Sequence, residues 1–350
     1  MNQLRVGIIG AGGIAEHAHI PGLKECENAR ITAICDIDPA RLQLIGDSLN
    51  LDASRRFSDA AALIACDDVD AVEICTPNYL HMPMALAVAK AGKFLSIEKP
   101  LALCAEDARE LTQVLAERGR DAMVCFSYRF RPAVRYAKHL IDQGILGRLL
   151  GMNVVYLKDS GLWPNRTMEW RFQAKYAGTG VLGDLGAHLV DMARFLAGDF
   201  ASICGRADII VPERPLPDGS GMGRVETDDC CNFLAEMACG ATANFSITRC
   251  AYGHRNTIRF ELYGEKGALS FHLDRPNILD IGCAALFPDH PELHEVAVPD
   301  GFVATQEQTF VNYALGMRDP YFPSLADGVA CQRVLDALKR SSVERHWIAL

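Results

Sequence analysis

Residues 4–20 read LRVGIIGAGGIAEHAHI, an apolar strand pattern that passes through a glycine-rich turn into a helix pattern. Gly10, Gly12 and Ala15 occupy the small-residue positions of the motif G-x-G-x-x-G/A. One glycine permits the tight strand-to-helix turn, the next lets the backbone approach a pyrophosphate, and a small third residue allows close packing of helix and strand. Because amide groups at a helix N-terminus attract phosphate, the stretch predicts a dinucleotide-binding site. The loop residues expected to contact the dinucleotide are Gly10, Gly12, Gly13 and Ile14.

Asp36 selects the kind of dinucleotide. It ends the second strand pattern, AICDID, roughly 20 residues beyond the glycine motif. A carboxylate there accepts hydrogen bonds from a free ribose 2′-hydroxyl and repels a 2′-phosphate. Arg41 is too far along the next helix to serve as a dedicated 2′-phosphate clamp. The sequence therefore favours NAD over NADP, and the alternative is a tight turn followed by an acid that caps a helix.

The two halves of the chain have different patterns. Up to about residue 123, continuous apolar strands such as DAVEICTP and KFLSIEKP alternate with helices, which predicts a parallel sheet covered on both faces. Beyond about residue 150, longer strands of alternating polarity are separated by glycine-containing turns, which is typical of antiparallel sheets. We expect an α/β protein with an NAD-binding Rossmann domain (1–123) and a substrate-binding and oligomerisation domain (124–350) whose large open sheet is mostly antiparallel. The Pro- and Gly-rich stretch 211–227 is expected to be a mobile excursion.

Composition limits the partners. Hydrophobic residues make up 49% of the 350 residues and charged ones 23%, as in globular proteins. The net charge of −9 argues against nucleic acid or an anionic membrane, and no apolar run reaches membrane-spanning length. The first strand leaves no room for a signal peptide, and the thirteen cysteines form no CxxC pair. We therefore expect a cytoplasmic protein with reduced thiols.

The stretch FLSIEKPLAL (94–103) interrupts a strand pattern with charge and a proline. In a parallel dinucleotide-binding sheet, the carboxyl end of a strand is where ligands bind, so Lys99 is expected in that crevice. Pro100 fixes the exit of the chain, with a cis bond as one option. The alternative is a solvated Glu98–Lys99 pair at a strand end.

The preceding strand ends in TPNYLH and reaches the same edge of the sheet. Its end is a suitable place to line the cofactor. His81 is either a cofactor contact or, as is more common in the first turn of a helix, a structural histidine. The residues expected to contact the cofactor at this edge are Thr76, Pro77, Asn78, His81, Glu98 and Lys99.

A third signal lies in GTGVLGDLGAHLVDMARFLAG, where Asp184 and His188 are four residues apart. On a helix this spacing places them on one face, and a nearby carboxylate orients a histidine and makes it a stronger base. The preceding glycines indicate a close backbone approach. A helix-stabilising pair and two ligands of a metal site are the alternatives; with no third ligand evident, we expect no metal.

Together GIIGAGGIA, AICDIDP, TPNYLH, EKP and DLGAH resemble the glucose–fructose oxidoreductase/inositol dehydrogenase/rhizopine catabolism (Gfo/Idh/MocA) family over nearly the whole chain. The resemblance implies a Rossmann domain followed by an α/β domain with an open sheet. It also implies that Lys99 lies beside the reacting carbon, that His188 is the acid/base, and that Asp184 orients His188 or binds substrate. By the same resemblance, Trp170 and Arg171 are expected near the cofactor, and Tyr128 and Arg129 in the substrate pocket with Lys99, Asp184 and His188.

The expected activity is NAD-dependent hydride removal from a secondary hydroxyl of a cyclic polyol, sugar or glycoside, as in inositol or glucoside 3-dehydrogenases. Which of Lys99 and His188 makes the first proton transfer stays open. The alternatives are an NADP-linked keto-sugar or dihydrodiol reductase, an NAD-cycling glycoside-cleaving enzyme, and a dinucleotide sensor without turnover. An apolar face on the second sheet would favour a homodimer or homotetramer.

Overall fold

The computed structural model describes residues 3–290 and 292–350, which divide into two compact units. The first unit contains the chain up to Ser127 and returns for Ala304–Val329, and the second contains Tyr128–Val303 and Ala330–Leu350. Residues 304–329, which the sequence placed in the second domain, pack in the first unit.

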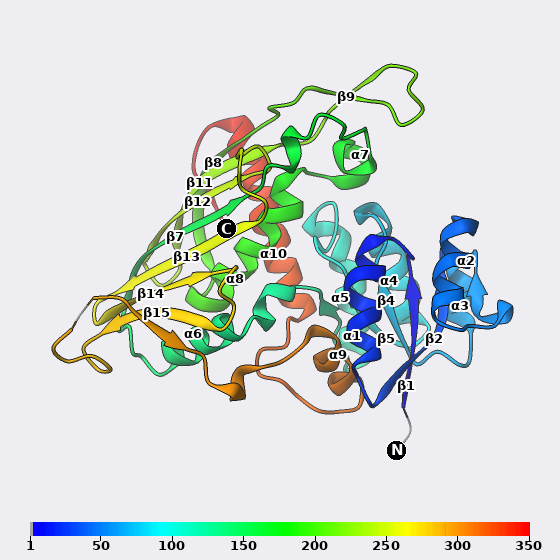
Figure 1. Cartoon of the computed structure of the whole chain (residues 1–350), viewed down its shortest axis with the longest axis horizontal. Helices are drawn as coiled ribbons and strands as arrows, with labels where there is room; N and C mark the ends of the chain where they lie inside the picture. The colour runs from blue at the N-terminus through cyan, green and yellow to red at the C-terminus, as the bar shows by residue number, and fades with distance from the viewer. Residues whose placement is uncertain (1–2, 291) are drawn as a thin grey trace. The chain divides into compact units, whose positions relative to one another are not determined.

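The first unit is built on a parallel sheet of strand order β3-β2-β1-β4-β5-β6 (Figure 1). Its strands are β1 (Leu4–Ile9), β2 (Ala29–Cys35), β3 (Arg56–Phe57), β4 (Ala71–Ile74), β5 (Phe94–Ile97) and β6 (Met123–Val124). Its helices are α1 (Ile20–Lys24), α2 (Pro39–Ser48), α3 (Ala60–Ala65), α4 (His81–Lys90), α5 (Arg109–Glu117) and α9 (Gln306–Ala314). This is the doubly wound order of a Rossmann fold, and the strand order reverses between β1 and β4, where such sheets bind ligands.

The core of the first unit explains why residues 304–329 belong to it. Val6 and Ile8 of β1 are fully buried, as are Phe310 and Val311 of α9, and all four share one apolar cluster. Helix α9 lies beside α1 in Figure 1 and packs against it. A late segment of the chain thus completes the core of the N-terminal sheet.

The second unit is built on a sheet of strand order β16-β15-β14-β13-β7-β12-β11-β8-β17. Its strands are β7 (Leu149–Leu157), β8 (Phe200–Asp208), β11 (Cys230–Met237), β12 (Thr242–Thr248), β13 (Thr257–Gly264), β14 (Gly267–His272), β15 (Ile278–Cys283), β16 (His294–Ala297) and β17 (Ile348–Ala349). Its helices are α6 (Pro132–Asp142), α7 (Ala174–Ala177) and α8 (Ala187–Ala197), and α10 (Leu325–Glu344) begins in the first unit and continues into this one. Neighbouring strands are antiparallel except for β7 and β12, which confirms the predicted fold class.

Alternating side chains give this sheet two different faces. In β11 every second residue is buried, including Phe233, which stacks on Phe245 of β12 with ring centroids 4.1 Å apart. Helices α6 and α8 pack on each other and against the sheet (Figure 1). Between the buried residues, strand residues such as Leu150 and Leu234 stay exposed. One face therefore forms the core and the other remains uncovered within the unit.

The stretch 211–227, expected as a mobile excursion, contains the hairpin β9 (Glu213–Pro215) and β10 (Met222–Arg224). Arg214 is buried, and its guanidinium lies 4.3 Å from the centroid of the Phe172 ring. The proline and glycine content predicted the turn but gave no sign of this anchor.

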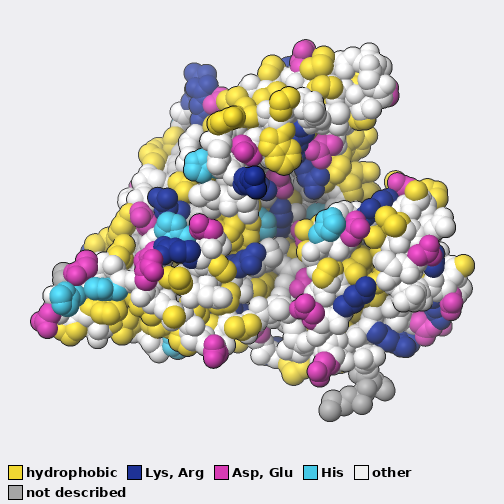
Figure 2. Space-filling model, in the orientation of Figure 1, with side chains coloured by type: hydrophobic (Ala, Val, Ile, Leu, Met, Phe, Trp, Pro, Cys, Tyr) yellow, Lys and Arg dark blue, Asp and Glu magenta, His cyan; other side chains and the backbone are white. Residues whose placement is uncertain are grey.

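The surface in Figure 2 has Lys and Arg side chains interspersed with Asp and Glu side chains. Within residues 3–290 and 292–350, no helix combines the length and apolar character needed to cross a bilayer.

Candidate active site

The glycine loop connects β1 to a π-helical turn, Ala15–His19, which continues into α1. Gly10 has φ +97°, and a Cβ there would lie 2.7 Å from the carbonyl oxygen of Cys75, so only glycine fits. At Gly12, by contrast, no described atom apart from Gly12 and its neighbours in the chain lies within 4 Å of where a Cβ would be. The loop therefore presents open backbone at the position where the motif requires a phosphate to approach.

Asp36 joins the end of β2 to the glycine loop. Its Oδ2 accepts a hydrogen bond from the Ala11 N–H (2.6 Å), and its Oδ1 accepts one from the Asp38 N–H (2.8 Å). Each carboxylate oxygen retains a second lone pair that a ribose hydroxyl can use. Arg41 reaches further back than its helical position indicated, since its guanidinium donates to the Ala11 carbonyl (2.6 Å) and to Glu16 (2.8 Å). That guanidinium is paired with an acid, as suits a site for an unphosphorylated ribose.

The ends of β4 and β5 carry the next predicted residues. Thr76 Oγ1 is buried and has no hydrogen-bond partner among the described residues, so it can bond to a ligand at this edge. His81 is fully buried, with Nδ1 2.9 Å from the Pro100 carbonyl oxygen and Nε2 2.9 Å from that of Thr76. Burial lowers the pKa of His81, and its two partners are backbone groups. Of the two options for His81, the geometry favours the structural one.

Lys99 follows β5 and precedes Pro100 through a cis peptide bond, which is the option considered for Pro100. The Glu98 side chain is buried: its Oε2 accepts from the Lys99 N–H (3.1 Å) and its Oε1 lies 2.9 Å from His19 Nε2. Burial opposes ionisation of Glu98, but the His19 hydrogen bond and the charges of His19 and Lys99 bring its pKa below the usual value. Glu98 is therefore an ionised anchor for the Lys99 backbone and not half of a solvated pair.

The second unit holds the other predicted residues. Asp184 lies in a π-helical turn, Leu182–Gly186, and His188 lies in α8, which begins immediately after it. A π-turn alters the angular relation that a spacing of four has on an α-helix, and such turns are frequent at functional sites. The predicted close approach is confirmed at Gly180, where a Cβ would lie 1.9 Å from the Asp228 carbonyl oxygen. Asp228 holds this segment through its carboxylate, which accepts the N–H groups of Gly180 (2.7 Å) and Leu182 (2.8 Å).

Two tyrosines extend the site around His188. The Tyr128 ring lies against the His188 ring, with centroids 4.4 Å apart, and its hydroxyl is 2.9 Å from that of Tyr156. Tyr156 donates its single proton to Asn256 Oδ1 (2.9 Å), so Tyr128 is the donor to Tyr156. Burial raises the pKa of Tyr156, and the Asp184 charge contributes, which keeps this hydroxyl protonated. The sequence gave no sign of Tyr156 or Asn256, because both read as ordinary strand and loop positions.

Arg129 is buried and forms an ion pair with Asp191. Its guanidinium donates to both carboxylate oxygens of Asp191 (2.7 and 2.5 Å), and both side chains are buried. Asp191 is three residues beyond His188 on α8. Arg129 therefore fixes the helix that carries His188, which is a positioning role.

Trp170 and Arg171 form a compact pair in the short 3-10 turn Trp170–Phe172. The Arg171 guanidinium lies 4.5 Å from the Trp170 ring centroid and donates to Glu169 (3.1 Å). Thr227 holds the turn by donating to the Arg171 carbonyl (2.8 Å). Trp170 and Arg171 thus contact each other, Glu169 and Thr227. That these two residues lie near the cofactor stays a prediction.

Comparisons with known proteins agree with this architecture. Residues 4–126 match the sequence model described as an oxidoreductase family with an NAD-binding Rossmann fold, and residues 134–270 match the GFO/IDH/MocA C-terminal domain. Levoglucosan dehydrogenase of Pseudarthrobacter phenanthrenivorans is 32% identical, over 99% of this chain and 98% of its own. Inositol 2-dehydrogenase of Rhizobium meliloti is 29% identical over 99% of both chains.

Among solved structures, a levoglucosan dehydrogenase in complex with NADH superimposes with a TM-score of 0.90, at 30% identity and over 99% of both chains. The open loop at Gly12, the Asp36 carboxylate and the orphaned hydroxyl of Thr76 fit the same cofactor, NAD. This enzyme chain belongs to the Gfo/Idh/MocA family of NAD-binding sugar and polyol oxidoreductases.

Proposed function

We propose that the protein is an NAD-dependent dehydrogenase that oxidises a secondary hydroxyl of a cyclic polyol, sugar or glycoside. The observation that carries the proposal is Lys99, placed at the carboxyl end of β5 in the NAD-binding unit and anchored through Glu98. NAD accepts a hydride at C4 of its nicotinamide when it is bound. The chain itself would hold it with the glycine loop, Asp36 and the edge residues Thr76, Pro77 and Asn78.

The remaining chemistry is proton transfer. His188 takes the hydroxyl proton of the substrate, and Asp184 orients His188 or binds a neighbouring substrate hydroxyl. The Lys99 ammonium donates a hydrogen bond to the same oxygen and stabilises the alkoxide charge that develops there. Tyr128 positions the His188 ring by packing against it, since its own proton is committed to Tyr156.

The substrate class follows from the relatives. The named relatives include dehydrogenases of levoglucosan, inositol and glucose 6-phosphate, all cyclic polyhydroxy compounds. We infer that this chain takes a substrate of the same shape, with vicinal ring hydroxyls that donate to Asp184 and accept from Lys99.

The test is to incubate the purified protein with NAD+ or NADP+ and a panel of inositols, pyranoses and glycosides, following both NADH absorbance and product release. NADH formation with one class of compound supports the proposal and names the substrate. Glycoside cleavage without net NADH would identify a cycling enzyme instead. Tight NAD binding with neither result would identify a dinucleotide sensor and contradict the proposal.

We also propose that the protein forms a homodimer or homotetramer through the uncovered face of the second sheet. Three large residues on its strands support this: Leu150 is 43% exposed, Leu234 51% and Tyr263 38%. Exposed apolar and aromatic side chains on a broad sheet are typical of an interface between copies.

A further inference from the structure

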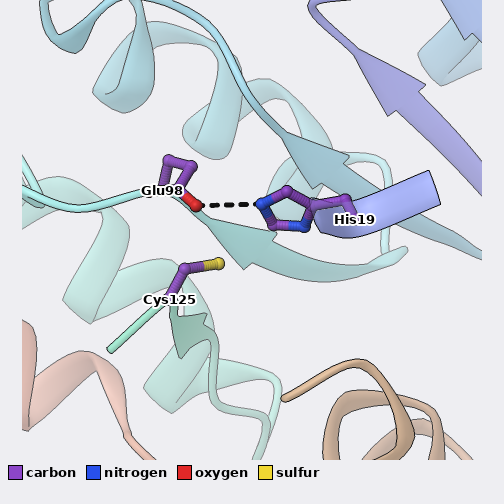
Figure 3. Close-up of side chains that lie close together, drawn as sticks. All are labelled: His19, Glu98 and Cys125. Carbon is purple, nitrogen blue, oxygen red and sulfur yellow. Dashed lines mark hydrogen bonds and ion pairs between the residues drawn. The ribbon is translucent and has the colours of Figure 1, made fainter. Parts of the chain in front are cut away.

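A buried charged cluster in the first unit joins Glu98, the neighbour of Lys99, to two residues that the sequence did not single out, His19 and Glu73. His19, the last residue of the π-helical turn, lies between Glu73 of β4 and Glu98 at the end of β5. Its Nδ1 is 2.8 Å from Glu73 Oε2 and its Nε2 is 2.9 Å from Glu98 Oε1. The three residues are 1%, 0% and 8% exposed, so water cannot screen their charges. Figure 3 shows the His19 ring directed at Glu98, with the Cys125 sulfur nearby.

The hydrogen bonds fix the number of protons in this cluster. A neutral imidazole has one N–H and can donate to only one carboxylate, whereas here a carboxylate oxygen faces each ring nitrogen. Two arrangements satisfy both contacts: an imidazolium between two carboxylates, and a neutral imidazole that accepts from one protonated carboxyl. The lowered pKa of Glu98 favours the imidazolium. Burial opposes protonation of His19, whereas the charge of the Glu73 carboxylate and the hydrogen bond to it favour protonation and raise the pKa of His19. His19 is therefore a buried cation held by two anions.

Other elements also face the ring. From α9, Glu307 Oε1 lies 3.9 Å from His19 Nδ1, and burial followed by the Glu73 charge raises the pKa of Glu307 to about 7. Cys125, which follows β6, has its sulfur 3.1 Å from the hydroxyl of Ser96 on β5. Burial raises the pKa of the Cys75 and Cys125 thiols, so at neutral pH neither adds a charge. The acids of the cluster thus outnumber its single internal cation.

The contacts of His19 with Glu73 and Glu98 fit hydrogen bonds better than they fit a bound metal ion. The ligand atoms of His19, Glu98 and Cys125 lie within 4.8 Å of one another. Zinc would need ligand distances of about 2.0–2.3 Å and a thiolate. Both ring nitrogens of His19 already face carboxylates, and burial keeps the thiol protonated.

Glu98 connects the cluster to Lys99. One oxygen of its carboxylate faces His19, and the other accepts the backbone N–H of Lys99. An uncharged residue in place of His19 would leave two buried carboxylates without a cation between them, and Glu98 would then be driven to take up a proton or to rotate. Rotation removes the acceptor of the Lys99 N–H, and protonation replaces a charged acceptor by a weaker neutral one.

We propose that His19 is a positioning residue for Lys99: as a cation clamped between Glu73 and Glu98, it holds the Glu98 carboxylate where that group anchors the Lys99 backbone. This inference rests on the proposed function of Lys99. His19 touches neither substrate nor cofactor in this role and acts only through Glu98.

The first experiment compares His19→Gln with His17→Gln, the same change two residues away at an exposed histidine. We expect His19→Gln to lower kcat at least tenfold while the dissociation constant of NADH, measured by fluorescence, stays within threefold. His17→Gln should leave both values unchanged. A His19→Gln enzyme with kcat within twofold of the wild type would overturn the proposal.

A second variant covers the case in which His19→Gln does not fold. Glu73→Gln keeps the Glu98 contact but removes one anion, so the pKa of His19 should fall toward the neutral range. Above that pKa His19 loses its charge and holds Glu98 by at most one neutral hydrogen bond, so kcat should decline at a lower pH than in the wild type. An unchanged pH profile in Glu73→Gln would contradict the clamp.

Two further measurements do not depend on turnover. They therefore test the clamp, the His19 cation held between Glu73 and Glu98, separately from the proposed dehydrogenase activity. Nitrogen NMR of 15N-histidine-labelled protein should show both His19 ring nitrogens protonated at pH 8, and hydrogen exchange at the Lys99 amide should be faster in Glu73→Gln than in the wild type at pH 9. A neutral His19 at pH 8, or one equivalent of bound metal in the purified protein, would overturn the proposal even if NADH is formed. If both measurements give the expected result but the protein shows no turnover, the positioning role of His19 is supported and the dehydrogenase proposal is contradicted.

Discussion

At the scale of single residues, replacing Lys99 should affect turnover without affecting cofactor binding. The Lys99→Ala variant should bind NADH normally, because the glycine loop and Asp36 are intact. Its turnover should fall by about 10²–10³, the loss typical when one donor to a developing oxyanion is removed. The measurements are kcat with the best compound of the panel and the NADH dissociation constant.

The matched control for Lys99 is Lys90→Ala, which removes an exposed lysine of α4 that pairs with Glu110. Lys90→Ala should keep wild-type kcat. Near-normal turnover in Lys99→Ala would remove Lys99 from the mechanism.

Asp36 governs the choice between the two dinucleotides. In Asp36→Asn the amide oxygen can still accept from the Ala11 N–H, but the charge that repels a 2′-phosphate is gone. Loss of a charged hydrogen-bond partner is worth about 1.5–3 kcal/mol, so the preference for NADH over NADPH should shrink at least tenfold. Titration of the variant with each reduced dinucleotide measures that ratio, and an unchanged ratio would show that selectivity lies elsewhere.

Whether a site residue could be predicted from the sequence depended on how far along the chain it lies from the residues it contacts. Gly10, Gly12, Asp36 and Lys99 are recognisable because short local patterns place them at strand ends. His19 meets Glu73 and Glu98 across 54 and 79 residues, and no local pattern relates them. The same limit hid Tyr156 and the pairing of Arg129 with Asp191.

At the scale of elements, α9 brings an acid into the core of the first unit. The folded pKa of Glu307 is about 7, above its ordinary unfolded value, so the folded state binds the extra proton between those two pH values. Stability is therefore lost as pH rises through this window, by roughly 3 kcal/mol at most, at about 1.4 kcal/mol per pKa unit. Glu307→Gln should gain stability over the wild type at pH 8 relative to pH 5.

Urea unfolding at the two pH values measures this difference for Glu307→Gln. The control is Glu27→Gln, since Glu27 is exposed on the same unit and its replacement should give the same difference at both pH values. A Glu307→Gln variant with equal effects at pH 5 and pH 8 would show that this acid does not titrate in the core.

Helices and strands could be predicted where apolar residues recur with a regular period. The strand–helix alternation before residue 123 and the alternating strands after 150 gave the fold class correctly. The hairpin 213–224 contradicts the expected mobile excursion, because Arg214 on Phe172 anchors it through a tertiary contact that no local pattern indicates. The helical pattern of α9 gave no sign of which sheet it covers, because an apolar face fits any apolar surface.

At the scale of the whole molecule, the uncovered sheet face makes a prediction about assembly. Leu234→Glu places a charge on an exposed strand position and should shift the protein toward monomer at micromolar concentration, measured by light scattering. Leu44→Glu is the matched control, because Leu44 is 54% exposed on α2. A wild-type protein that is already monomeric would reject the proposed interface.

The return of residues 304–329 to the first unit has a consequence for how the protein is made. The ribosome synthesises the strands of the parallel sheet first. Phe310 and Val311, which complete the core of that sheet, are synthesised only near the end of translation. The NAD-binding unit is thus among the first parts to be translated and among the last to be finished. A fragment ending near residue 127 would expose the apolar surface that α9 covers, so chimaeras with relatives have to exchange both segments together.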